Sequence, residues 1–163
     1  MTKSIFSLIF ISLIMSTTDS FSQKKEVKHV EWKTAAQLQN PDGSLSIGFA
    51  GPINGVNNDV LLVAGGANFP DKMPWEGGKK SYSKTIHVLQ KCGDTFSWIA
   101  AVKNTLAEPI AYCGTTSTDL GVVYVGGENE NGLSNKSYLL KWNAEAKEVE
   151  IKSLPNFPLA IAN

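Results

Sequence analysis

The feature that most constrains the fold is an apolar run ending in two glycines, which occurs twice. Leu62-Val-Ala-Gly-Gly66 and Tyr124-Val-Gly-Gly127 share this pattern. From Gly66 to Leu89 is 23 residues, whereas from Gly127 to Leu140 is 13, so the first copy carries an insertion of ten residues. This insertion falls within residues 68–80. The two copies therefore indicate that the chain is built from repeated structural units.

The spacing beyond the glycine pairs continues the repeat. Pro109-Ile-Ala-Tyr-Cys-Gly114 matches Pro158-Leu-Ala-Ile-Ala-Asn163 at an offset of 49 residues. Trp98 and Val149 each stand nine residues after the leucine that ends the preceding run. A period of about 50 residues is typical of kelch repeats, whose units are four-stranded propeller blades. Two glycines at a strand end suit such a blade, because they allow positive φ and close approach of neighbouring backbones.

These patterns predict an all-β, kelch-type β-propeller rather than a β-sandwich with coincidental Gly-Gly turns. The four strands of a unit are one that carries Phe49 or Tyr112, one that ends in Gly-Gly, one that ends in leucine, and an outer strand. Within a partial propeller over 23–163, the predicted parts are a closing outer strand at 27–33, a blade at 44–102, a second blade at 109–152 and the start of a third at 158–163. A closed ring needs four to eight blades, so we expect the chain to be the N-terminal part of a longer protein.

Residues 1–22 have the features of a secretory signal peptide. Lys3 provides a positive charge, and residues 5–15 form an apolar run that is shorter than the roughly 20 residues of a membrane span. Small residues around Ser22 suit cleavage before Gln23. We therefore expect export across the inner membrane to the periplasm, with no membrane attachment after cleavage.

The charged residues exclude several classes of partner. The chain has 15 basic and 15 acidic residues, and every basic residue is lysine. A balanced charge argues against a nucleic-acid-binding protein. Without arginine, the chain has no guanidinium for bidentate capture of a carboxylate. The two histidines lack the spacing of metal ligands, and we expect no metal and no cofactor.

Four stretches resemble one kelch subfamily closely. They are Gly-Phe-Ala-Gly51, Val-Ala-Gly-Gly-Ala-Asn-Phe-Pro70, Met-Pro-Trp-Glu-Gly-Gly-Lys-Lys80 and Val-Gly-Gly-Glu-Asn-Glu-Asn-Gly132. From about residue 30 to the end, the chain resembles the N-acetylneuraminate epimerases, or sialic acid mutarotases, in a cyclically permuted form. The resemblance implies an exported, six-bladed, cofactor-free enzyme that interconverts the α and β anomers of N-acetylneuraminic acid. It also implies that the acid and base residues lie in later blades, beyond Asn163, so the catalytic residues are unknown here and this part alone is expected to be inactive.

Four residues are candidates for substrate binding. Asn68 and Asn129 each stand two residues after the second glycine of a pair, where the loops of kelch propellers open onto the ligand face. Glu128 lies on the second of these loops, and Glu76 lies in the insertion, where it could belong to a lid. Each also has a plainer interpretation, since asparagine caps turns readily and a loop glutamate is usually solvated.

Other polar residues receive structural interpretations. Lys79 and Lys80 are expected on the surface, although either could attract an anionic sugar, and Tyr82 and Tyr112 are expected in the core or between blades. His87 alternates within a strand and is interpreted as structural. Two separate thiols, with Cys113 buried, are favoured over a disulfide to Cys92.

Two functions remain in view. The first is an exported mutarotase that opens and recloses the sugar ring by general acid–base catalysis. The alternative is a non-catalytic kelch propeller that binds a glycan or a protein partner on the same face.

Overall fold

The computed structural model describes residues 29–40, 43–100 and 102–163. The chain divides into two units, Met1–Lys33 and Thr34–Asn163. The predicted signal peptide lies outside the described residues. Residues 29–33, the described part of the predicted closing strand, carry no strand, and that strand stays a prediction. No helix among the described residues has the length and apolar character to cross a membrane.

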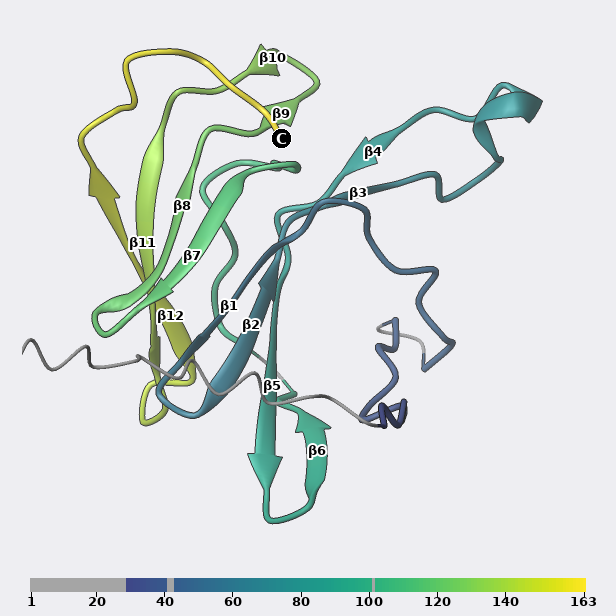
Figure 1. The fold of residues 1–163 in the computed structure, drawn as a ribbon. Coiled ribbons are helices and arrows are strands. Elements are labelled where there is room, and N and C mark those ends of the chain that lie inside the picture. The colour runs from purple at the N-terminus through teal and green to yellow at the C-terminus, as the bar shows by residue number, and fades with distance from the viewer. Residues whose placement is uncertain (1–28, 41–42, 101) are drawn as a thin grey trace, which may run out of the picture. The chain divides into compact units, whose positions relative to one another are not determined.

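The second unit is all-β, as predicted (Figure 1). Its first four-stranded antiparallel sheet consists of β1 (Ile53–Asn57), β2 (Val60–Ala64), β5 (Ile86–Cys92) and β6 (Thr95–Trp98), in that order. Its second consists of β7 (Gly114–Thr118), β8 (Gly121–Val125), β11 (Ser137–Asn143) and β12 (Glu148–Leu154), in that order. The one helix of the described residues is the 3-10 turn η1 (Pro74–Glu76).

Each sheet carries a two-stranded hairpin beyond its glycine pair, which we call its arm. The first arm pairs β3 (Ala67–Asn68) with β4 (Ser81–Tyr82), and the second pairs β9 (Glu128–Asn129) with β10 (Gly132–Leu133). The insertion predicted at 68–80 lengthens the first arm, with η1 near its tip (Figure 1).

The register of the two sheets repeats despite the insertion. Leu61 pairs with Leu89 between β2 and β5, and Val122 pairs with Leu140 between β8 and β11. Leu89 and Leu140 are therefore equivalent in the ladder. Both were predicted to end the third strand, but each lies at its middle, because β5 and β11 continue to Cys92 and Asn143. An arm can gain residues without moving the strands that follow it, because both of its ends return to the same point.

The first strand of each sheet begins later than the sequence predicted. The strands expected to carry Phe49 and Tyr112 are replaced by isolated bridges, Ala50 to Ala67 and Ala111 to Glu128. The continuous strands start only at Ile53 and Gly114. The cause is local: Gly51 has φ +56° and Tyr112 has φ +58°, and a left-handed residue ends an extended run.

Two predicted equivalences are wrong by two residues. Trp98 pairs with Leu89, but Leu140 pairs with Ile151 rather than Val149, because the β11–β12 turn is two residues longer than the β5–β6 turn. The match of residues 109–114 with residues 158–163, at an offset of 49, is also displaced by two residues. Gly66 donates its N–H to the Ile110 carbonyl, and Gly127 donates to the Ile161 carbonyl, so the structural offset is 51 residues.

The core lies where the two sheets face each other. Gly55 of β1 lies against Val122 of β8, so closely that a Cβ on the glycine would come within 2.7 Å of both valine methyl groups. The backbone N–H of Trp142 donates to Asn57 Oδ1 across the interface at 2.8 Å. The largest fully buried side chains are Ile53, Leu62, Leu106, Ile110, Leu140, Val88, Val122 and Val149. Burial of apolar area between the sheets therefore holds them face to face.

Candidate functional site

The glycine pairs create the turns from which the arms leave the sheets. Gly66 and Gly127 have φ of +91° and +99°, a region that L side chains rarely adopt. Space is short as well, since a Cβ on Gly66 would lie 2.6 Å from Phe49 Cβ, and one on Gly127 would lie 2.5 Å from Cys113 Sγ. The two reasons predicted for glycine at these positions, positive φ and close approach of neighbouring atoms, are thus both confirmed. The bases of the two arms lie close enough for side chains of one to bond to the other.

Glu128, at the start of the second arm, is bonded to the base of the first. Its Oε1 lies 2.9 Å from Lys80 Nζ and accepts a hydrogen bond of 2.8 Å from the Tyr82 hydroxyl. Lys80 Nζ also lies 5.1 Å from the ring centroid of Tyr112 and 5.5 Å from that of Tyr82. Both distances are within the range of cation–π attraction. We call these four residues the Glu128 cluster.

The Glu128 cluster holds one anion and one cation at neutral pH. The hydrogen bond from Lys80, followed by that from Tyr82, lowers the pKa of the Glu128 carboxyl. The bond to Glu128 raises the pKa of the Lys80 ammonium. Burial, with the bond to Glu128 next in size, raises the pKa of the Tyr82 hydroxyl. The carboxylate thus stays ionised and the phenol stays protonated, so Tyr82 is a donor throughout the ordinary pH range.

A hollow of about 640 Å³ adjoins the cluster, and Tyr112 belongs to both. Its lining is mainly apolar: Ile47, Gly48, Phe49, Ala50, Ala67, Asn68, Phe69, Pro70, Asp71, Lys72, Met73, Glu76 and Tyr112. An apolar concavity with a few polar groups is the usual form of a small-molecule site. The first arm and the segment before β1 supply all of the lining except Tyr112.

The four candidate residues occupy different parts of this region. Asn68 lines the hollow and donates from Nδ2 to the Gly48 carbonyl at 3.1 Å. Glu76 also lines it, and its Oε2 accepts the N–H of Met73 at 3.2 Å, which caps η1. Glu128 is the centre of the cluster. Asn129 accepts the N–H of Asn131 at 2.8 Å, which closes the turn of the second arm. Substrate contact by each of the four stays a prediction.

Sequence reasoning predicted the environments of the three residues around Glu128 but not their association with it. Lys80 was expected on the surface and is exposed, but its pairing with a carboxylate 48 residues away was not predicted. Tyr82 and Tyr112 were assigned to the core or a blade interface, and both lie at the interface. The Tyr82 hydroxyl bonds to Glu128 of the other blade, and the Tyr112 ring packs against Gly51 of the first. One signal was present: Lys80 and Tyr82 stand two apart where the arm rejoins the sheet, and alternate residues of a strand share a face. What they face depends on how the two sheets stack, which no local pattern contains.

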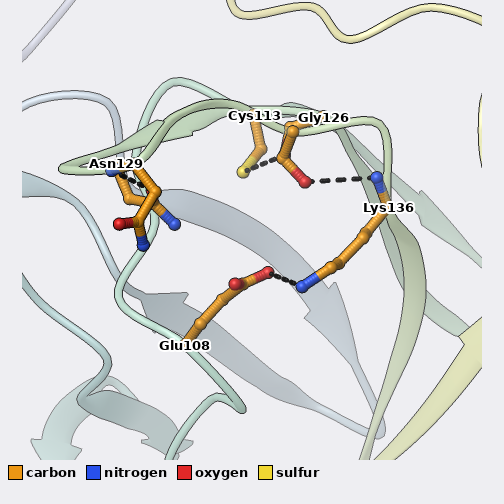
Figure 2. Close-up of polar contacts among 7 residues, drawn as sticks. Glu108, Cys113, Gly126, Asn129 and Lys136 are labelled. Carbon is orange, nitrogen blue, oxygen red and sulfur yellow. Dashed lines mark hydrogen bonds and ion pairs between the residues drawn. The ribbon is translucent and has the colours of Figure 1, made fainter.

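A second ion pair joins neighbouring segments outside the cluster. Lys136 Nζ lies 2.8 Å from Glu108 Oε1, and the thiol of Cys113 contacts the Gly126 carbonyl at 3.3 Å (Figure 2). Burial raises the pKa of Cys113 to about 12, so this thiol is inert. Cys92 is exposed and both cysteines are free, which confirms the prediction of two separate thiols. The described residues contain no group of three side chains suited to hold a metal ion.

His87 lies between two aromatic rings. Its ring centroid is 5.9 Å from that of Phe49 and 6.0 Å from that of Trp98. Nε2 is buried and has no hydrogen-bond partner among the described residues. Burial lowers the pKa of the imidazole, which is therefore neutral at physiological pH. This environment agrees with a structural histidine.

Comparison with known proteins places these observations in a family. The N-acetylneuraminate epimerase family matches over residues 15–151. The N-acetylneuraminate epimerase of Vibrio cholerae is 35% identical over 156 residues, which cover 85% of this chain and 39% of the relative. That of Haemophilus influenzae (strain PittEE) is 31% identical over 123 residues, covering 72% of this chain and 32% of the relative. The chain thus spans about two fifths or less of these relatives.

A solved structure gives the same architecture. It is described as the structure of YjhT, is 26% identical in sequence, and superposes with a TM-score of 0.56 over 75% of this chain and 34% of its own. Stacked four-stranded sheets with Gly-Gly arms define the class, a kelch-type β-propeller, of which this chain supplies two blades. The chain belongs to the N-acetylneuraminate epimerase family.

Proposed function

We propose that the chain is part of a mutarotase that interconverts the α and β anomers of N-acetylneuraminate. Family membership and the names of the relatives support this reaction. The observation that carries the proposal to particular residues is the contact between the Glu128 cluster and the apolar hollow, which share Tyr112. One region thereby offers a fixed anionic acceptor beside apolar and aromatic surface.

This combination suits a sugar acid that carries an acetamido group. Hydroxyl groups donate readily to a carboxylate, and a methyl group gains from leaving water for an apolar surface. We infer that Asn68 and Glu128 contact the sugar, with Glu76 at the edge of the hollow and Asn129 on the neighbouring turn. Mutarotation itself requires a proton to leave the anomeric hydroxyl and another to reach the ring oxygen, after which the carbonyl rotates and the ring recloses. The groups that transfer these protons are proposed to lie beyond Asn163.

The proposal is tested by following anomer exchange directly. A sialidase releases the α anomer, and one-dimensional proton NMR records its conversion to the β anomer with and without the full-length protein. The expected result is equilibration faster than in buffer alone. Binding of N-acetylneuraminate without acceleration would instead support the non-catalytic glycan-binding propeller.

We also propose export to the periplasm and a protein longer than this chain. The apolar run after Lys3 and the small residues near Ser22 support export. Expression of the full-length protein in a Gram-negative host, followed by fractionation and N-terminal sequencing, checks this. A periplasmic protein that begins at Gln23 is expected, and a cytoplasmic protein that retains Met1 would contradict export.

A further inference from the structure

We propose that Lys80 and Tyr82 are positioning residues that fix Glu128 as an acceptor for a hydroxyl group of the sugar, and that Lys80 does not bind the carboxylate of the substrate. This inference rests on the proposed function but makes a separate claim. It assigns one role to the carboxylate and another to the cation beside it. It can therefore fail while mutarotation itself is upheld.

The two donors meet at one oxygen of Glu128. Lys80 Nζ and the Tyr82 hydroxyl are 2.9 and 2.8 Å from Oε1, and they approach from the same short segment of the first arm. Two hydrogen bonds to one oxygen hold that oxygen in place, and they restrict the rotation of the carboxylate because donors prefer to lie near its plane. Within the described ranges, Oε2 has no hydrogen-bond partner, and the side chain is 29% exposed. The second oxygen is thus held ready for a donor from outside the protein.

The surroundings of Lys80 disfavour a second anion. Its ammonium is already paired with Glu128 and lies over the rings of Tyr82 and Tyr112. A carboxylate approaching the ammonium would also approach the negative charge of Glu128, and it would meet the electron-rich faces of the two rings. Substrate hydroxyl groups meet no such repulsion at Glu128. The Lys80–Glu128 pair therefore offers the ligand a hydrogen-bond acceptor, Glu128, and does not offer it a free cation.

The Glu128 cluster is shared between the two blades: one blade supplies the acceptor and the other supplies the two donors. Glu128 belongs to the second arm, whereas Lys80 and Tyr82 belong to the base of the longer first arm. A glutamate in a short two-stranded hairpin would otherwise rotate freely, at a cost in entropy when it binds. The neighbouring blade removes that freedom in advance.

A double-mutant cycle separates positioning from direct contact. In the full-length protein, Lys80→Met and Glu128→Gln are each expected to raise KM for N-acetylneuraminate about tenfold and to change kcat by less than about threefold. The double variant is expected to match Glu128→Gln alone, because Lys80 acts only through Glu128. Tyr82→Phe, which removes one of the two donors, is expected to raise KM by a smaller factor.

The cycle has a matched control on the same molecule. Lys136→Met breaks the Lys136–Glu108 pair, which has the same kind of contact at 2.8 Å but lies outside the cluster, and it is expected to leave KM unchanged. Melting temperatures of all variants exclude loss of folded protein as the cause.

Three outcomes would overturn the inference. If the effects of Lys80→Met and Glu128→Gln on KM multiply in the double variant, Lys80 contacts the substrate itself. If Glu128→Gln and Glu128→Ala both leave KM unchanged, Glu128 is not an acceptor, because alanine removes the oxygen that glutamine retains. A wild-type protein that binds N-acetylneuraminate without accelerating anomer exchange refutes the proposed function alone, and the same cycle is then read from Kd by calorimetry. A wild-type protein that neither binds nor accelerates refutes both.

Discussion

The two blades share one ladder but differ in what covers them. Leu61 in the first blade and Val122 in the second are equivalent by register, yet Leu61 is half-buried and Val122 is fully buried. The reason is that the first blade lies on this face of the second, whereas the same face of the first is covered only in part, by the segment that brings Gln37 to Trp98 and Phe49 to His87. Gly55 and Thr116 show the same effect on the opposite faces of the two sheets. Each is the middle residue of the first strand of its sheet, but the face with Gly55 packs against the other blade and Thr116 is exposed. The repeat thus determines which residues pair within a sheet, whereas the packing of the neighbouring sheet determines which side chains fit at equivalent positions.

The largest effect is expected from the covered face. Leu140→Ala removes a side chain with no exposed area and should lower the free energy of unfolding by about 2–5 kcal/mol. Leu61→Ala, on the same face of the first blade, should cost clearly less, because the Leu61 side chain is only half-buried and less apolar area is exposed to water on unfolding. Urea unfolding of both variants measures the difference. Equal losses would contradict the account of the two faces.

The next effect concerns the glycine at the interface. Gly55→Thr places a Cβ where the Val122 methyl groups already lie, and overpacking of this kind costs about 1–3 kcal/mol. The converse change, Thr116→Gly, should cost only about 0.5–1 kcal/mol through backbone entropy in a strand. Thermal melts of the two variants rank them. A Gly55→Thr protein as stable as the wild type would mean that the sheets do not pack as described.

A buried hydrogen bond gives a comparable or smaller effect. Asn57→Ala leaves the buried N–H of Trp142 without its acceptor, at a cost of about 1–3 kcal/mol. Thr118 occupies the equivalent position in the second blade, is exposed, and bonds only within its own turn. Thr118→Ala should therefore cost about 0.5 kcal/mol or less. Denaturant midpoints of the two variants provide the test, and a larger loss for Thr118→Ala would reverse the ranking.

The smallest predicted effect depends on pH. Burial holds the pKa of His87 below its value of 6.5 in the unfolded chain, so the unfolded state binds a proton more readily. The stability that comes from a neutral His87 is present above pH 6.5 and is lost as pH falls below it. Tyr138 occupies the equivalent position, so His87→Tyr should flatten the decline in melting temperature between pH 7.5 and about 5.5. If the melting temperature of the variant declines as steeply as that of the wild type, the decline comes from groups other than His87.

The sequence predicted the fold well where the information is local. The glycine pairs, the equivalence of Leu89 and Leu140, and the ten-residue insertion all appear in the structure at the expected places. The first strands were predicted too early because positive φ at a non-glycine residue, Tyr112, leaves no clear mark in the sequence. The outer-strand equivalences failed by two residues because turn length, not strand pattern, fixes that register.

The candidate site was predicted less completely for a different reason. Glu128 was selected from its place after a glycine pair, which is a local feature. Its partners Lys80 and Tyr82 come from the other blade, and their contact depends on the angle at which two sheets stack. A carboxylate and a cation 48 residues apart cannot be matched without that angle. Positions near the glycines were therefore predictable, and pairings across the blades were not.

The unchanged ladder beneath the longer arm has a consequence for engineering. Because ten extra residues leave the Leu61–Leu89 pairing in the same register as Val122–Leu140, the arm behaves as a cassette whose length is independent of its scaffold. Loops of other lengths and sequences could be transplanted at Asn68 and Lys80 in the same way. New recognition surfaces could then be selected on a framework that does not have to be redesigned.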